Sequence, residues 1–126
     1  MRYLIDANCC IYLFADRHPA LSRRVTSLRH GELGLSTIVL AELALGSQNG
    51  KAPPMALLDL FASRLPVLAF DEAAARAYAQ LPFRRGRFDR LLAAHALSLG
   101  VSLITNNEAD FADIPGLKVE NWTLPA

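Results

Sequence analysis

Four side chains in this sequence carry oxygen atoms of the kind that bind metal ions, and their positions beside or within apolar stretches predict a shared site. Three are carboxylic acids and one is an amide, and each adjoins or interrupts an apolar stretch. Carboxylates gathered in one place repel one another unless a cation lies among them, and hard oxygen ligands suit Mg²⁺ or Mn²⁺. Such an ion binds phosphate oxygens, activates a water and stabilises charge on a leaving oxygen. The residues are Asp6, Glu42, Asp89 and Asn107.

Asp6 directly follows the short apolar run at residues 3–5, which predicts a buried strand. In open α/β sheets, ligands bind beyond the carboxyl ends of the strands. Asp6 is therefore placed for chemistry if the chain builds such a sheet. An Asp at this point also commonly caps the helix that follows, and this stretch alone does not decide between the two roles.

Glu42 lies in the middle of residues 36–46, a predicted helix that carries apolar side chains all round. Such a helix is typically buried, and an isolated buried carboxylate is costly unless it is protonated, paired or bound to a metal. A salt bridge to an arginine, or an exposed gap at the helix edge, would also explain it. We favour a functional role, because polar residues that intrude into apolar surroundings are informative.

Asp89 stands in the first turn of a predicted helix at residues 88–99, where an Asp taken alone is more often a cap. Asn107 follows an apolar strand at residues 101–104, and Asp110 comes three residues later. This repeats the pattern seen at Asp6, an apolar strand that ends in polar and acidic side chains. His95 is turned away from Asp89 by helical spacing, so we interpret it as a packing or surface residue.

The remaining sequence alternates strands with helices, which predicts a parallel sheet covered by helices on both faces. Asp6 and the segment 105–110 would then share one rim of the sheet, although periodicity does not tell whether their strands are neighbours. In the helix at 55–64 we expect the apolar residues Leu57, Leu58, Leu60 and Phe61 to face inward. Strands are expected at 3–5, 33–35, 66–70, 101–104 and 118–120, and helices at 8–15, 20–29, 36–46, 55–64, 72–80 and 88–99.

Length and composition are those of one domain spanning residues 1–126, with 52% hydrophobic residues to fill a core. No apolar run is long enough to span a membrane, and Asp6 interrupts the N-terminal apolar segment, unlike a signal peptide. The adjacent Cys9 and Cys10 are expected to be reduced core thiols. We therefore expect a cytoplasmic protein without a membrane partner.

Charge gives little direction, because the net charge is only +1. The cations are nevertheless mostly arginines, and residues 84–87 form one dense basic patch. Arginine is the better bidentate phosphate ligand, and this patch leads directly into Asp89. We expect it either to hold phosphates or to be a solvated loop.

The sequence resembles the PIN-domain ribonucleases, and within them the VapC-type toxins of bacterial toxin–antitoxin pairs. The resemblance covers essentially the whole chain, and no single block would carry it alone. Its blocks, in order, are residues 3–8 around Asp6, 36–43 around Glu42, 88–96 around Asp89, 103–111 around Asn107, and the shorter 114–117 and 119–122.

The resemblance implies a three-layer α/β/α domain with a central, mostly parallel sheet and a metal-dependent endoribonuclease activity. A metal-activated water would hydrolyse the RNA phosphodiester and leave a 5′-phosphate and a 3′-hydroxyl. Asp6 and Asp89 would be the main ligands of Mg²⁺, with Mn²⁺ as an alternative, and Glu42 would complete the acidic pocket. The fourth family position falls on Asn107, which Asp110 could replace or support.

One position departs from the family pattern. The family usually carries Thr or Ser after its first Asp, and this chain has Ala7. The missing hydroxyl puts the fine positioning of Asp6 in doubt, and Thr105 or Asn8 could orient the carboxylate instead.

The resemblance also implies partners. These are an RNA substrate, a cognate antitoxin lying across the early helices with an Arg in the acidic pocket, a homodimer, and operator DNA only through the antitoxin. A catalytically degenerate PIN domain that only binds a partner or RNA is the alternative that Ala7 and Asn107 leave open. A phosphatase or phospho-receiver with Asp6 as nucleophile is disfavoured by Asn8 in place of a second Asp and by the missing late Lys. A dinucleotide-binding role lacks its glycine-rich turn.

Overall fold

The computed structural model describes residues 1–84 and 88–125. Five parallel strands form one sheet in the order β3-β2-β1-β4-β5, so that the first strand is central. The strands are β1 (Tyr3–Ile5), β2 (Leu33–Ser36), β3 (Val67–Leu68), β4 (Ser102–Ile104) and β5 (Val119–Glu120).

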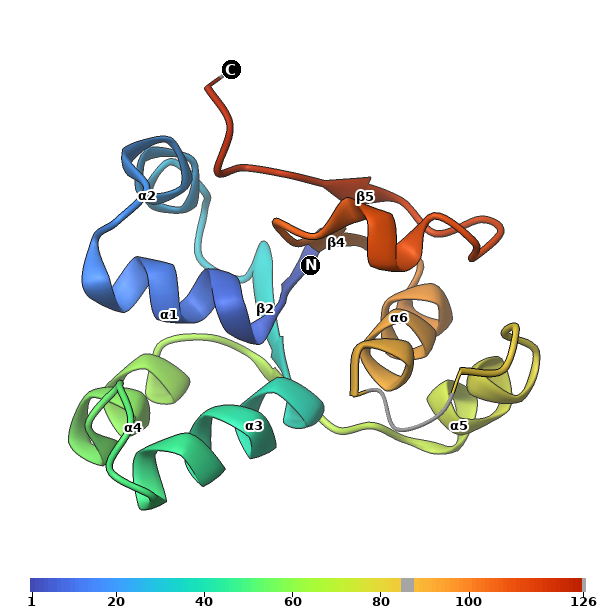
Figure 1. Ribbon diagram of the computed structural model, residues 1–126, viewed down its shortest axis with the longest axis horizontal. Coiled ribbons are helices and arrows are strands. Elements are labelled where there is room, and N and C mark those ends of the chain that lie inside the picture. Colours follow the sequence, from blue (N-terminus) through green and yellow to red (C-terminus); the bar gives the residue numbers. More distant parts are fainter. Residues whose placement is uncertain (85–87, 126) are drawn as a thin grey trace.

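Helices cover both sides of the sheet. In Figure 1, α1, α2 and α4 lie to the left of β1 and β2, α5 and α6 lie to the right, and α3 starts beside the end of β2. This arrangement confirms the predicted α/β/α fold with a parallel sheet. The helices are α1 (Ala7–Ala15), α2 (Pro19–Thr26), α3 (Thr37–Gln48), α4 (Met55–Ser63), α5 (Glu72–Ala79) and α6 (Phe88–Leu99), and a 3₁₀ turn, η1 (Glu108–Phe111), follows β4.

The pairing of β1 with β4 brings the two predicted polar strand ends together. Ile5 is in register with Ile104, and the backbone N–H of Asp6 donates to the Ile104 carbonyl at 3.0 Å. Asp6 and Thr105 therefore stand on neighbouring strands at one rim, a relationship that the sequence left undecided.

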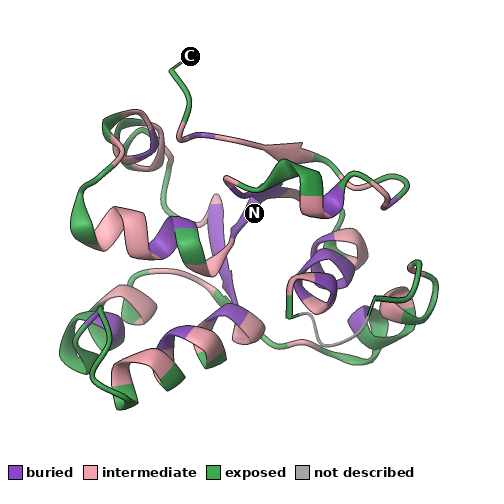
Figure 2. Cartoon of the chain, in the orientation of Figure 1, coloured by how far each residue is buried: buried purple, intermediate pink, exposed green. Residues whose placement is uncertain are grey.

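Buried residues concentrate in the central strands and in α6 (Figure 2). Leu4 and Ile5 are fully buried, and Trp122 anchors the C-terminal segment with its ring 4.8 Å from that of Tyr3, centre to centre. Cys9 and Cys10 are free and buried, as predicted. No helix in the part of the chain that the structure describes is long and apolar enough to cross a membrane.

Two expectations about burial were wrong. In α3 only a stripe around Val39 and Leu43 is buried, and Leu45 is 62% exposed, so the helix is not enclosed on all sides. In α4 only Leu58 is fully buried, whereas Leu57 and Leu60 are 39% and 48% exposed. Both helices lie on the outside of the domain and pack against each other, so each turns one face to solvent although that face is apolar.

Candidate acidic site at the carboxyl ends of the strands

Asp6 performs one of the two roles that the sequence allowed, that of a helix cap. It caps α1, because its Oδ1 accepts the backbone N–H of Cys9 at 2.8 Å. Burial raises the pKa of the Cys9 thiol, and the nearby Asp6 carboxylate raises it further. Within the described residues, neither Thr105 nor Asn8 donates to this carboxylate, so the expectation that one of them replaces the missing hydroxyl at Ala7 was wrong. Cys9 orients Asp6 instead, through the cap bond to Oδ1.

Glu42 lies half-buried in the second turn of α3, on the side that faces Asp6 and Asp89. Its pKa is raised to about 7, first by burial and then by the charges of Asp89 and Asp6. One carboxylate raises the pKa of another in this way only when the two are close together. The charges of Asp6, at the end of β1, and of Asp89, in α6, therefore both act on Glu42 in α3.

Asn107 stands on the same rim, in the turn after β4. Its side-chain amide donates to Asp110 Oδ2 at 2.7 Å, and its backbone N–H donates to the Thr105 hydroxyl at 3.1 Å. Asn107 and Asp110 thus form a pair rather than two alternatives for one position. Asn107 is exposed, and its side-chain amide is directed to Asp110.

The donor set has the chemistry of a site for a hard divalent cation. Carboxylate oxygens are the ligands that such ions prefer. Burial is the main cause of the raised pKa of Glu42, and a cation would relieve the smaller part that comes from the charges of Asp89 and Asp6. Within residues 1–84 and 88–125, no three Asp, Glu, His or Cys side chains stand close enough together to hold an ion as placed. Small side-chain adjustments of the three acids would be part of binding.

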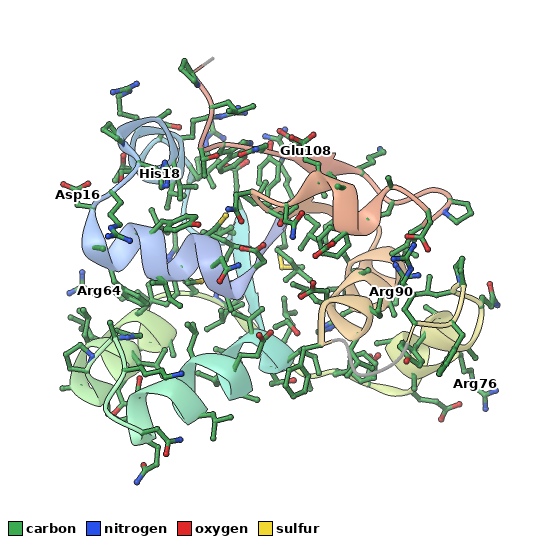
Figure 3. The ribbon with its side chains drawn as sticks, viewed as in Figure 1. Asp16, His18, Arg64, Arg76, Arg90 and Glu108 are labelled. Atoms are coloured by element: carbon green, nitrogen blue, oxygen red, sulfur yellow. The ribbon has the colours of Figure 1, made fainter. Side chains whose placement is uncertain are left out.

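A buried arginine, which sequence reasoning did not single out, supports the rim. Arg90 follows Asp89 directly and is 2% exposed. Its guanidinium donates to both carboxylate oxygens of Asp113 at 2.9 and 3.0 Å and to the Pro82 carbonyl at 2.8 Å. In Figure 3 its side chain extends from α6 toward the segment that follows β4. This pairing holds the pKa of Asp113 below its usual range and ties the start of α6 to the segment that carries Asn107.

A second polar contact joins α6 to α3. Nδ1 of His95 lies 2.8 Å from the hydroxyl oxygen of Ser36, the residue that caps α3. His95 is 1% exposed, so it is the packing residue of the two interpretations offered above. No local sequence pattern predicts a contact between Ser36 and His95. Only the tertiary structure, which brings α6 beside the start of α3, reveals it.

The basic patch is only partly visible. Arg84 is exposed, and its Nε lies 3.5 Å from Asp113 Oδ2. The rest of the patch, residues 85–87, lies outside the described residues.

Comparison with known proteins agrees with this geometry. The model of the family described as "PIN domain" matches residues 3–117. The chain belongs to the PIN-domain family. Within it, the chain is similar to VapC proteins over nearly its full length. It is 33% identical to the "tRNA(fMet)-specific endonuclease VapC" of Shigella flexneri over 98% of this chain and 99% of that protein.

Solved structures give the same result. The crystal structure of VapBC2 from Rickettsia felis, bound to a DNA fragment from its promoter, contains a chain that is 31% identical with a TM-score of 0.85. That match covers 97% of this chain and 99% of the other. The DNA-bound VapBC of Salmonella typhimurium gives 32% identity and a TM-score of 0.85, with coverage of 97% and 98%. These relatives confirm the predicted family and fold.

Proposed function

We propose that this chain is a VapC-type endoribonuclease, the toxin of a toxin–antitoxin pair. One observation carries the proposal, namely that Glu42 is half-buried and that its pKa is raised first by this burial and then by the charges of Asp89 and Asp6. The three acids come from separate elements, and Asp6 follows β1 at the rim of the sheet where α/β proteins bind their ligands. The names of the relatives support ribonuclease activity.

Asp6 and Asp89 would hold a divalent cation, Mg²⁺ or alternatively Mn²⁺, with Glu42 completing the acidic pocket. When bound, such an ion would supply positive charge to the phosphate and to the developing charge on the leaving oxygen. The cap bond of 2.8 Å from the backbone N–H of Cys9 would hold the Asp6 carboxylate in place at the end of β1. Asn107, paired with Asp110, would contribute from the neighbouring strand end.

In the metal-free protein the pKa of Glu42 is raised to about 7, and a bound cation would lower it, so that the carboxylate would be ionised at neutral pH and able to act as a general base. It would accept a proton from the attacking water as the new oxygen–phosphorus bond forms. The bond from phosphorus to the 3′ oxygen would break, and that oxygen would take up a proton. The products would carry a 5′-phosphate and a 3′-hydroxyl.

The basic patch at residues 84–87 would hold phosphates of the substrate, since it leads directly into the helix that carries Asp89. Replacing Arg84, Arg85 and Arg87 with Ala should weaken RNA binding and flatten its dependence on salt. Unchanged affinity at low salt would refute this role.

Partners follow from the same relationship. Chains similar to this one occur in VapBC toxin–antitoxin complexes, some of them bound to DNA. We infer a cognate antitoxin, binding of operator DNA through that antitoxin, and a homodimer.

Cleavage of a labelled RNA tests the proposal directly. The wild type should cut with Mg²⁺ and stop with EDTA, and Asp6→Asn and Asp89→Asn should be inactive. Asp59→Asn, an exposed acid on α4, is the matched control and should remain active. Equal cleavage in all samples would indicate a contaminating nuclease. RNA binding without cleavage in the wild type would favour the degenerate domain instead.

A further inference from the structure

A cavity of about 360 Å³ lies between α1 and α3 and opens beside Glu42. Its volume falls within the range of small-ligand sites. Residues of the first turns of α1 form one wall, and the second half of α3 with the turn after it forms the other. The lining residues that matter here are Asn8, Ile11, Glu42, Leu45, Asn49 and Lys51.

The cavity has an apolar middle and polar ends. Ile11 and Leu43 supply apolar surface, and Leu45 beside them is 62% exposed. Glu42 stands at the end that belongs to the acidic site, and Lys51 stands beyond the last turn of α3. An apolar surface between hydrogen-bonding groups suits a flat ring that also has polar edges.

The polar groups at the far end are held in place. The side-chain amide of Asn49 donates to the Leu45 carbonyl at 2.8 Å, and this bond fixes the Asn49 side chain at the edge of the cavity. The backbone N–H of Lys51 donates to the Gly46 carbonyl at 2.8 Å, so the turn folds back against the helix. Within the described residues the Lys51 ammonium makes no ion pair, which leaves its charge for a ligand.

The spacing along α3 sets the size of the ligand. From Glu42 to Asn49 the helix rises about 10 Å. We propose that this cavity binds one nucleotide of the RNA beside the bond that is cut. Its base packs on Ile11 and Leu45, its polar edges meet Asn8 and Asn49, and a phosphate contacts Lys51. This subsite deepens the proposed function and rests on it.

The chemistry favours RNA over a protein segment in this cavity. A phosphate complements the ammonium, and base edges complement two amides. By contrast, the cavity of about 290 Å³ between α1, α2 and α4 is lined by Leu13, Phe14, Val25, Leu57, Leu60 and Phe61, with Arg64 at its side. That surface has the composition of a protein contact.

Binding of a fluorescent single-stranded RNA to the full-length protein in EDTA tests the subsite without cleavage. Lys51→Ala should weaken binding roughly 3- to 10-fold and reduce the salt slope by about 0.7, and Lys51→Arg should restore both. Lys118→Ala removes the other lysine of the chain, which is exposed near the edge strand, and should behave as the wild type. In cleavage assays with Mg²⁺, Lys51→Ala should raise KM more than it lowers kcat.

The outcomes separate this inference from the proposed function. If the wild type cuts RNA while Lys51→Ala and Asn49→Ala keep its affinity, salt slope and KM, the subsite is refuted and the nuclease stands. If Lys51→Glu keeps RNA binding but loses a partner protein, a peptide occupies the cavity and the inference is overturned. If the wild type neither cuts nor binds RNA, the proposed function itself fails.

Discussion

The hydroxyl oxygen of Ser36 lies 2.8 Å from Nδ1 of His95, and this buried contact joins the helices that carry Glu42 and Asp89. Ser36 also accepts the Ile38 backbone N–H at 3.1 Å, and His95 hydrogen-bonds the Ala69 carbonyl. Burial lowers the pKa of His95, so the ring is neutral near pH 7 and accepts from Ser36 while it donates to the carbonyl. The distance between two of the three acids therefore depends on one serine–histidine pair.

Ser36→Ala should destabilise the protein by about 1–2 kcal/mol, because it removes a helix cap and leaves a buried ring nitrogen unpaired. The acids would be held less firmly, so kcat should fall by about 10-fold with little change in KM. Urea unfolding and steady-state RNA cleavage measure the two effects. Ser63→Ala, at an exposed helix end, is the control. Unchanged kcat in a destabilised Ser36→Ala would limit the pair to a structural role.

Glu42→Gln should stabilise the protein above neutral pH and should reduce its RNA cleavage. Because the folded state raises the pKa of Glu42 to about 7, above the ordinary value of 4.5, its stabilising contribution is complete below pH 4.5 and is lost as the pH rises through 7. In EDTA at pH 8 the free energy of unfolding of Glu42→Gln should therefore exceed that of the wild type by about 1 kcal/mol, after allowance for solvent screening. Urea unfolding measures this difference.

The same variant should lose about 100-fold or more of its RNA cleavage if Glu42 accepts the proton of the attacking water.

Thermal unfolding of the wild type and of Glu42→Gln at pH 4.5 and pH 8 tests the stability prediction, since the two proteins should differ only at the higher pH. A Glu42→Gln variant that is less stable than the wild type at pH 8 would contradict the raised pKa on which this prediction depends.

Arg90→Met should cost about 1–3 kcal/mol, because it removes the hydrogen bonds that the buried guanidinium donates to the partly exposed Asp113 and to the Pro82 carbonyl. The double variant Arg90→Met with Asp113→Leu should recover part of this loss. Arg76→Met breaks the exposed pair with Glu72 and should change stability by less than about 0.5 kcal/mol. Equal effects of Arg90→Met and Arg76→Met would show that the buried pair does not hold the rim.

Metal binding should be visible in stability. At pH 7.5, Mg²⁺ or Mn²⁺ should raise Tm of the wild type in proportion to the logarithm of its concentration once it exceeds Kd. Asp6→Asn and Asp89→Asn should abolish the increase, whereas Asp59→Asn should retain it. A rise of the same size in every variant would indicate a site elsewhere.

The sequence predicted the parts of the site that local patterns encode. The apolar run before Asp6 marks a strand end, and the alternation of strands with helices places all strand ends of a parallel sheet on one rim. Glu42 was singled out because it interrupts an apolar helix, and the structure places it half-buried and under the influence of the charges of Asp89 and Asp6, although the helix is only half enclosed. An apolar pattern does not distinguish a buried face from an exposed one, and for this reason Leu45, Leu57 and Leu60 were misplaced.

The supporting contacts could not be predicted, because they join residues that only the tertiary fold brings together. Ser36 and His95 are 59 positions apart, and Arg90 and Asp113 are 23 apart. The orientation of Asp6 was missed for another reason. The family pattern directed attention to the side chain at Ala7, whereas the backbone N–H of Cys9 performs that task.

The most direct test of the shared acidic site is an NMR titration of the Glu42 carboxyl carbon in the metal-free protein. A pKa near 7 in the wild type, a lower value in Asp89→Asn, and a lower value again when Mg²⁺ saturates the wild type would support one cation site built from three acids. A pKa close to 4.5 in the wild type, unchanged by Asp89→Asn and by Mg²⁺, would contradict it.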